Sequence, residues 1–126
     1  MKKIIIETTE APKPIGPYSQ AVVGNNMVFI SGQISINPIT NEVVNSDIMS
    51  ETHQVMKNLM AILNAAGINF SHVLKSTILL SDMNYFSNVN EIYESYFVSD
   101  YPARETFAVR GLPKNVNVEI SMIATL

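Results

Sequence analysis

The chain has 126 residues, of which 47% are apolar and 15% charged, which predicts one folded domain over residues 1–126 rather than a disordered chain. The absence of cysteine excludes a disulfide framework, a thiolate nucleophile and a cysteine metal site. Eight basic residues are scattered among eleven acidic ones, for a net charge of -3, so no nucleic-acid partner is expected.

The opening residues carry two lysines and then three isoleucines, which superficially resembles an export signal. The apolar stretch is too short for that purpose, and no run approaches the length of a membrane span. We therefore expect no membrane partner and a cytoplasmic location.

The first third of the chain is expected to form three short strands. Residues 4–6 are a β-branched run, and residues 11–17 form a loop because three prolines break any ladder. A strand over 18–23, a tight turn at 24–26 and a strand over 27–31 then predict a β-hairpin.

A long helix is expected from Ile48 to Ala66. Asp47 suits its N-cap and Gly67 its C′ position. Apolar residues recur at helical spacing along one side of this segment: Val55, Leu59, Ile62, Leu63 and Ala66.

The second half predicts a strand over 73–80 and then a second helix with Asn84 as its cap. The apolar stripe of that helix is Phe86, Val89, Tyr93, Tyr96 and Phe97. Asn90 interrupts this stripe, which is unusual for a helix that only packs against a core.

Two strands are expected at the end of the chain. Residues 104–109 would place Arg104, Thr106 and Ala108 on one face, and residues 116–122 alternate apolar with polar side chains. The resulting element order predicts an α+β fold, with a mixed sheet of about six strands and two helices on one face.

The common catalytic signatures are missing from the sequence. His53 and His72 lack the spacing of a zinc motif, no Gly-x-Ser-x-Gly elbow is present, and no glycine-rich phosphate loop is found. Ordinary surface or capping roles are expected for both histidines. Catalysis without a metal, cofactor or covalent intermediate remains open, as does binding alone.

Three residues are candidates for a site, each with a plain alternative. Arg104 at the head of an apolar strand is either a solvated strand end or a guanidinium that grips a carboxylate. Glu119 is either the polar side of a half-exposed strand or a group that shares a pocket with Arg104. Tyr18 is either a core aromatic or a hydroxyl at a pocket mouth.

The sequence resembles the Rid family of reactive-intermediate deaminases, also called YjgF or L-PSP. The matching segments follow one another in order along nearly the whole chain. They are Ile15–Ala21, Phe29–Ile34, Asn58-Leu59, Ala65–Gly67, Asp82–Phe86, Val89–Tyr93, Pro102–Arg104, Leu112–Lys114 and Val118–Ile120.

The resemblance implies a chorismate-mutase-like subunit in a homotrimer, with sites in the clefts between subunits. It also implies hydrolysis of 2-iminobutanoate, 2-iminopropanoate and their enamine tautomers to 2-oxo acids and ammonia. Such intermediates are released by pyridoxal-phosphate-dependent dehydratases, which links the chain functionally to those enzymes.

The resemblance also implies roles for particular residues. Arg104 would hold the substrate carboxylate, and Glu119 would position or activate the attacking water. The cleft would be lined by Tyr18, Ser31, Gly32 and Asn90. Thr106 is a departure, because many RidA-type members have cysteine there; its backbone N–H would preserve a substrate contact, and its hydroxyl adds a possible hydrogen bond.

Two other functions are carried as alternatives. One is a non-catalytic module that binds a small carboxylate through Arg104, as a regulator or chaperone-like protein. The other is an endoribonuclease or translation inhibitor, which the acidic balance and the lack of a basic stripe disfavour.

Overall fold

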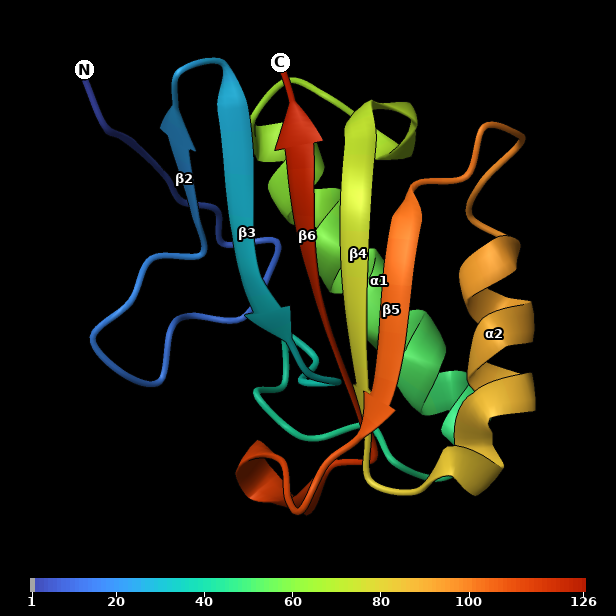
Figure 1. Cartoon of the computed structure of the whole chain (residues 1–126). Coiled ribbons are helices and arrows are strands. Elements are labelled where there is room, and N and C mark those ends of the chain that lie inside the picture. The colour runs from blue at the N-terminus through green and yellow to red at the C-terminus, as the bar shows by residue number, and fades with distance from the viewer. Residues whose placement is uncertain (1) are drawn as a thin grey trace.

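The computed structural model describes residues 2–126 as a six-stranded sheet with two helices against one face (Figure 1). The strands lie in the order β1-β2-β3-β6-β4-β5, and every neighbouring pair is antiparallel except β4 and β5. The elements are β1 (Ile4–Ile6), β2 (Ala21–Gly24), β3 (Met27–Gln33), α1 (Ile48–Ala65), β4 (Val73–Leu80), α2 (Phe86–Glu94), β5 (Ala103–Ala108) and β6 (Val118–Thr125). The expected α+β fold with a mixed sheet is confirmed.

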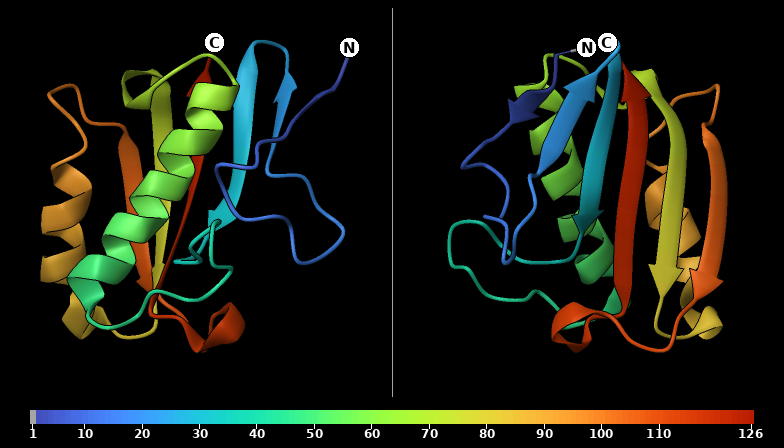
Figure 2. Two further views of the ribbon diagram at one scale, coloured as in Figure 1. Left: turned by 180° about the vertical axis from the view of Figure 1, so that it is seen from behind. Right: turned by 60° about the vertical axis from the view of Figure 1, so that its left-hand side comes forward.

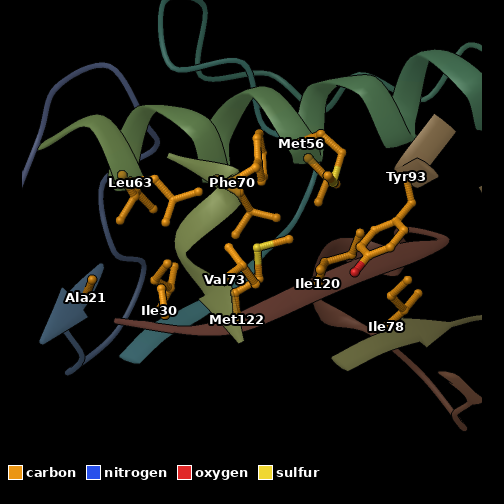
Figure 3. Close-up of a cluster of buried hydrophobic side chains, with 14 of the residues drawn as sticks. Ala21, Ile30, Met56, Leu63, Phe70, Val73, Ile78, Tyr93, Ile120 and Met122 are labelled. Atoms are coloured by element: carbon orange, nitrogen blue, oxygen red, sulfur yellow. The ribbon is translucent and has the colours of Figure 1, made fainter. Parts of the chain in front are cut away.

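Both helices cover the same side of the sheet and leave the other side open (Figure 2). The helix-facing side chains of β6 are buried and alternate with half-exposed ones on the open face. The main core forms between α1 and the sheet, where Ile30, Met56, Ile120 and Met122 pack together (Figure 3). The open face is covered by neither helix (Figure 2). Within residues 2–126, no helix has the length and apolar character required to cross a membrane.

The hairpin and the first helix agree with the expectations from the sequence. Asn25 and Asn26 have φ of 53° and 63°, the left-handed backbone that a two-residue hairpin turn requires and asparagine tolerates. The Asp47 carboxylate accepts a hydrogen bond of 2.8 Å from the Ser50 N–H at the start of α1. Gly67, just beyond the helix, has φ of +80°.

Four predicted boundaries are wrong. α2 ends at Glu94, so Tyr96 and Phe97 of the expected stripe lie beyond the helix. Residues 18–20 belong to the loop, and β2 starts at Ala21 rather than at residue 18. Asn84 is not a helix cap: Asp82 caps a single 3₁₀ turn, Met83–Tyr85, and α2 begins after it. The last strand begins at Val118 rather than Val116, because a 3₁₀ turn at Pro113–Asn115 with two left-handed residues delays its pairing.

Candidate active site

Glu119 and Gly32 meet on the open face of the sheet. β6 carries Glu119 beside the part of β3 where the register shifts between Ile30 and Gln33. A Cβ on Gly32 would lie 2.8 Å from Cδ of Glu119 and 3.0 Å from its Cγ, closer than real side chains approach. The carboxyl group therefore occupies the space that any side chain at position 32 would need.

Four of the expected site residues line one cavity of about 330 Å³. Glu119 and Gly32 form part of its floor, and Tyr18 and Ser31 join them from the loop before β2 and from β3. The rest of the wall combines apolar side chains with one lysine and two glutamines: Pro12, Lys13, Ile15, Gln20, Gln33, Ile34, Ile36 and Pro113. Small-molecule sites commonly combine apolar walls with polar groups that converge on the ligand.

The Glu119 carboxyl has an environment suited to proton transfer. The side chain is half-buried, and this burial raises the pKa of the carboxyl above its ordinary value. No salt bridge to Glu119 is present among residues 2–126, where Lys75 and Glu105 form the one ion pair. A raised pKa brings a carboxylate closer to the strength that a general base or acid needs near neutral pH.

The loop that carries Tyr18 is attached to the sheet by side-chain hydrogen bonds. The Ser31 hydroxyl donates to the Ser19 carbonyl over 2.6 Å. The Gln20 amide donates to the carbonyls of Thr8, Ala11 and Pro12 and accepts from the Thr8 N–H. Tyr18 is 46% exposed, so it is not a core aromatic and instead lies at the cavity edge. Sequence reasoning missed Gln20, because a loop glutamine gives no periodic signal.

Arg104 lies in a different place, at the edge of the sheet beside α2. Its Nη1 donates to Oδ1 of Asn90 over 2.6 Å. The guanidinium carbon lies 5.6 Å from the Phe86 ring centroid and 5.4 Å from that of Tyr93, the geometry of cation–π contacts. Asn90, which interrupts the apolar stripe of α2, is thus a hydrogen-bond partner of the arginine.

The Arg104 guanidinium remains available to a ligand. Within residues 2–126 it has no acidic partner, and its side chain is exposed. It lines a cavity of about 390 Å³ together with Asn90, Tyr93, Glu94, Tyr101 and Pro102. The Glu94 carboxylate accepts from the Tyr101 hydroxyl over 3.4 Å and forms no salt bridge with Arg104. The Tyr93 hydroxyl is engaged, because it donates to Ser76 over 2.9 Å. Several guanidinium N–H groups are therefore free to bind an anion.

Thr106 lies beneath Arg104 on the same strand. Its hydroxyl is buried and has no hydrogen-bond partner in the described chain. The small void around it, bordered by Asn90 and Arg104, has no room for a water molecule. The hydroxyl contact considered for Thr106 is thus not made within residues 2–126, and a backbone contact to substrate stays a prediction.

One chain does not bring Arg104 and Glu119 together. β4 separates their strands, and the register pairs Arg104 with Ser76 but Glu119 with Leu79. Residues paired across a sheet point to the same face. Ser76 is buried beneath α2, whereas Glu119 is on the open face. One chain by itself therefore does not form the pocket that the two residues were expected to share.

The histidines have the ordinary roles expected of them. His72 accepts from the Asn69 N–H and completes a capping box, and Nδ1 of His53 lies 2.9 Å from the Tyr96 hydroxyl. In the described part of the chain, no group of three or more metal-ligating side chains is found.

Known proteins resemble this chain over nearly its full length. The model of the family described as Endoribonuclease L-PSP matches residues 8–126. The human protein named 2-iminobutanoate/2-iminopropanoate deaminase is 46% identical over 120 residues, which cover 95% of this chain and 88% of that protein. A solved structure from Yersinia pestis, described as a protein of unknown function of the conserved Rid family, superposes with a TM-score of 0.97 at 46% identity and covers 99% of this chain and 100% of its own.

A second solved structure shows a similar fold with a ligand. Escherichia coli TdcF with bound serine is 40% identical, has a TM-score of 0.93, and covers 98% of both chains. The similarity therefore extends over both halves of the candidate site, Glu119 on β6 and Arg104 on β5.

Proposed function

From the premise that this chain belongs to the L-PSP family, also called Rid, we propose that it is a deaminase of 2-imino acids. Its substrates are 2-iminobutanoate, 2-iminopropanoate and their enamine tautomers, and its products are 2-oxo acids and ammonia. The observation that carries the proposal is the Arg104 guanidinium, which is held by Asn90 and paired with no acid in residues 2–126. A cation in this state suits a small carboxylate, which all these substrates possess.

The complete site requires a second copy of the chain. Arg104 and Glu119 are on opposite faces of one sheet, so no small molecule contacts both within a subunit. Two phenylalanines lie exposed on the open face: Phe29 has 48% of its surface accessible and Phe107 has 53%. These exposed aromatics support the proposed homotrimer, in which the Arg104 cavity of one subunit meets the Glu119 cavity of the next.

Hydrolysis of an imine requires no strong nucleophile from the protein. The carbon of a protonated imine is already electrophilic, so water adds without a covalent catalyst. Arg104 orients the carboxylate, and Glu119 accepts a proton as water bonds to the carbon. The nitrogen of the resulting carbinolamine takes that proton back from Glu119. As the C–N bond breaks and ammonia leaves, the Glu119 carboxylate accepts the hydroxyl proton, and the carbonyl of the 2-oxo acid forms.

The raised pKa of Glu119 supports its double role in these steps. The carboxylate form accepts the proton of the water, and the carboxylic acid returns a proton to the departing nitrogen. A carboxyl with its pKa raised towards neutrality exchanges protons more readily in both directions than an ordinary glutamate.

The test is a coupled assay in which a threonine dehydratase generates 2-iminobutanoate and ammonia release is followed with and without this protein. Arg104→Ala should lower kcat/KM by about tenfold to a hundredfold, because a charge-assisted hydrogen-bonded pair contributes roughly 1.5–3 kcal/mol. Arg110→Ala is the matched control, since this exposed arginine has no part in either cavity. Equal rates for wild type and Arg104→Ala would refute the assignment.

Two other functions give different results in the same experiments. A carboxylate-binding regulator would bind 2-oxobutanoate and leave imine hydrolysis unchanged. An endoribonuclease, as the family description suggests, would cleave RNA through repeated purification and independently of Arg104. We also place the protein in the cytoplasm beside pyridoxal-phosphate-dependent dehydratases, which cell fractionation would check.

A further inference from the structure

A fully buried carboxylate lies behind the sheet, outside both cavities. Glu51 in the first turn of α1 has 0% of its surface exposed. Its Oε2 accepts from the backbone N–H of Asn117 over 2.6 Å and from that of Val118 over 3.1 Å. Its Oε1 accepts from the Asn117 side-chain amide over 3.1 Å. These donors satisfy acceptor oxygens that would otherwise be costly to bury.

Asn117 is held from its other side as well. Its backbone carbonyl accepts from the Ser81 N–H over 3.0 Å, and its side-chain oxygen accepts from the Ser81 hydroxyl over 2.8 Å. Both its backbone groups and both its side-chain groups are therefore used. This set of contacts among Glu51, Asn117 and Ser81 is called the Glu51 clamp below.

The clamp acts where the chain enters β6. The preceding turn is irregular, because Lys114 and Asn115 both have φ of 55°. Pro113 of that turn lines the Glu119 cavity, and Glu119 itself follows Val118 directly. The clamp thus fixes the backbone between Pro113 and Glu119, two residues that line the cavity, from the opposite face of the sheet.

We propose that Glu51 is a positioning residue for Glu119. It acts through the backbone of Asn117 and Val118, holding the Glu119 carboxyl in the space that Gly32 leaves open. The expected effect on kcat rests on the proposed function. The expected effect on the backbone of residues 116–120 rests on the hydrogen bonds alone. Small displacements of a proton-transfer group lower the rate strongly, on the order of a hundredfold for 1 Å.

The test compares two changes at position 51. Glu51→Leu removes the acceptors and leaves the two backbone N–H groups without partners. We expect kcat to fall on the order of tenfold with KM within about twofold, since Arg104 on β5 still binds the carboxylate. Amide hydrogen exchange across residues 116–120 should accelerate by more than about tenfold, because that segment opens locally.

Glu51→Gln should restore both properties to within about twofold of wild type. The glutamine oxygen accepts from the two N–H groups, and its amide donates to Asn117 once that side chain turns over. The Ser81 hydroxyl then accepts instead of donating. Asn117→Ala, which removes only the side-chain contacts, should give a smaller fall in kcat of about threefold.

Thr52→Val is the matched control. Thr52 is buried to the same extent on the next position of α1, but its hydroxyl bonds within the helix to the Ile48 carbonyl. This variant should lose stability without changing kcat or the exchange of residues 116–120. All rates are measured below the unfolding temperature of each variant, with sedimentation to check that the assembly is unchanged.

Each remaining outcome decides the proposal. If folded Glu51→Leu keeps both kcat and the exchange pattern, the positioning role is wrong. If Glu51→Leu fails to fold, Glu51→Ala, which also removes the acceptors, decides in the same way. Wild type and Glu119→Gln are assayed alongside. If wild type does not accelerate hydrolysis, the deaminase proposal fails on its own, and the exchange data still accept or reject the clamp.

Discussion

The two halves of the candidate site are held in place by different means. Glu119 lies on an interior strand, and its position depends on the backbones of β3 and β6. Arg104 lies on the edge strand β5, and its position depends on side chains of α2, namely Asn90, Phe86 and Tyr93. The first half is half-buried and the second exposed.

This difference has a functional consequence. A proton-transfer group gains from burial, because desolvation raises its pKa towards neutrality. A carboxylate-binding arginine needs free N–H groups and therefore an open position. We expect the Glu119 half to be sensitive to any added bulk and the Arg104 half to the charge and hydrogen bonding of its neighbours.

The largest expected effect is at Gly32. Gly32→Ala places a methyl group where the Glu119 carboxyl lies, so the carboxyl must move out of position. We expect kcat/KM for 2-iminobutanoate to fall by about a hundredfold in the dehydratase-coupled assay. Gly111→Ala is the control, because nothing lies within 4 Å of a Cβ there. An active Gly32→Ala would show that Glu119 does not need its present position.

A smaller effect is expected at Asn90. Asn90→Asp sets a carboxylate within hydrogen-bond distance of Arg104 and so competes with the carboxylate of the ligand. The Kd of 2-oxobutanoate, measured by calorimetry, should rise by about tenfold. Asn90→Leu, which removes the contact without adding charge, should weaken binding less. The reverse order would mean that Asn90 contacts the ligand and does not chiefly hold Arg104.

The buried hydroxyl of Thr106 predicts a change in stability. Thr106→Val replaces an unpartnered hydroxyl by a methyl group of similar size, so the free energy of unfolding should rise by about 1 kcal/mol. Urea denaturation measures this change. Thr106→Ser keeps the hydroxyl and loses the methyl, and it should be less stable than wild type. If Thr106→Val is destabilised, the hydroxyl must find a partner, such as a group of a second subunit.

The smallest effect concerns pH. The folded-state pKa of Glu119 is raised above 4.5, so the folded protein holds more protons on this group than the unfolded chain does. Its contribution to stability is complete below pH 4.5 and is lost as the pH rises through the folded-state value. Relative to Glu119→Gln, wild type should therefore lose stability as the pH rises over this window, as thermal unfolding at several pH values would show. Parallel curves for the two proteins would mean that burial does not shift this carboxyl.

Much of the fold could be predicted from local patterns. The period of α1, its cap at Asp47 and its stop at Gly67 depend on near neighbours, and all were found. The errors lie where a turn competes with a regular element. Asp82 rather than Asn84 caps the first turn before α2, and both residues are plausible caps by type.

The sequence by itself determined which residues are on which face of each element. The alternation along β6 puts Glu119 opposite the buried side chains, and helical spacing puts Asn90 on the apolar side of α2. The sequence also contains the motifs that resemble the Rid family, because each motif is a short local segment. Such patterns depend only on residues a few positions apart.

The tertiary structure alone decided which of these faces meet. The strand order separates Arg104 from Glu119 by β4 and puts them on opposite sides of the sheet. It also brings Glu51 into contact with residues 117 and 118, which come 66 and 67 positions after Glu51 in the chain. Strand pairing and buried contacts over such distances leave no periodic trace in the sequence, because they depend on how distant surfaces fit together.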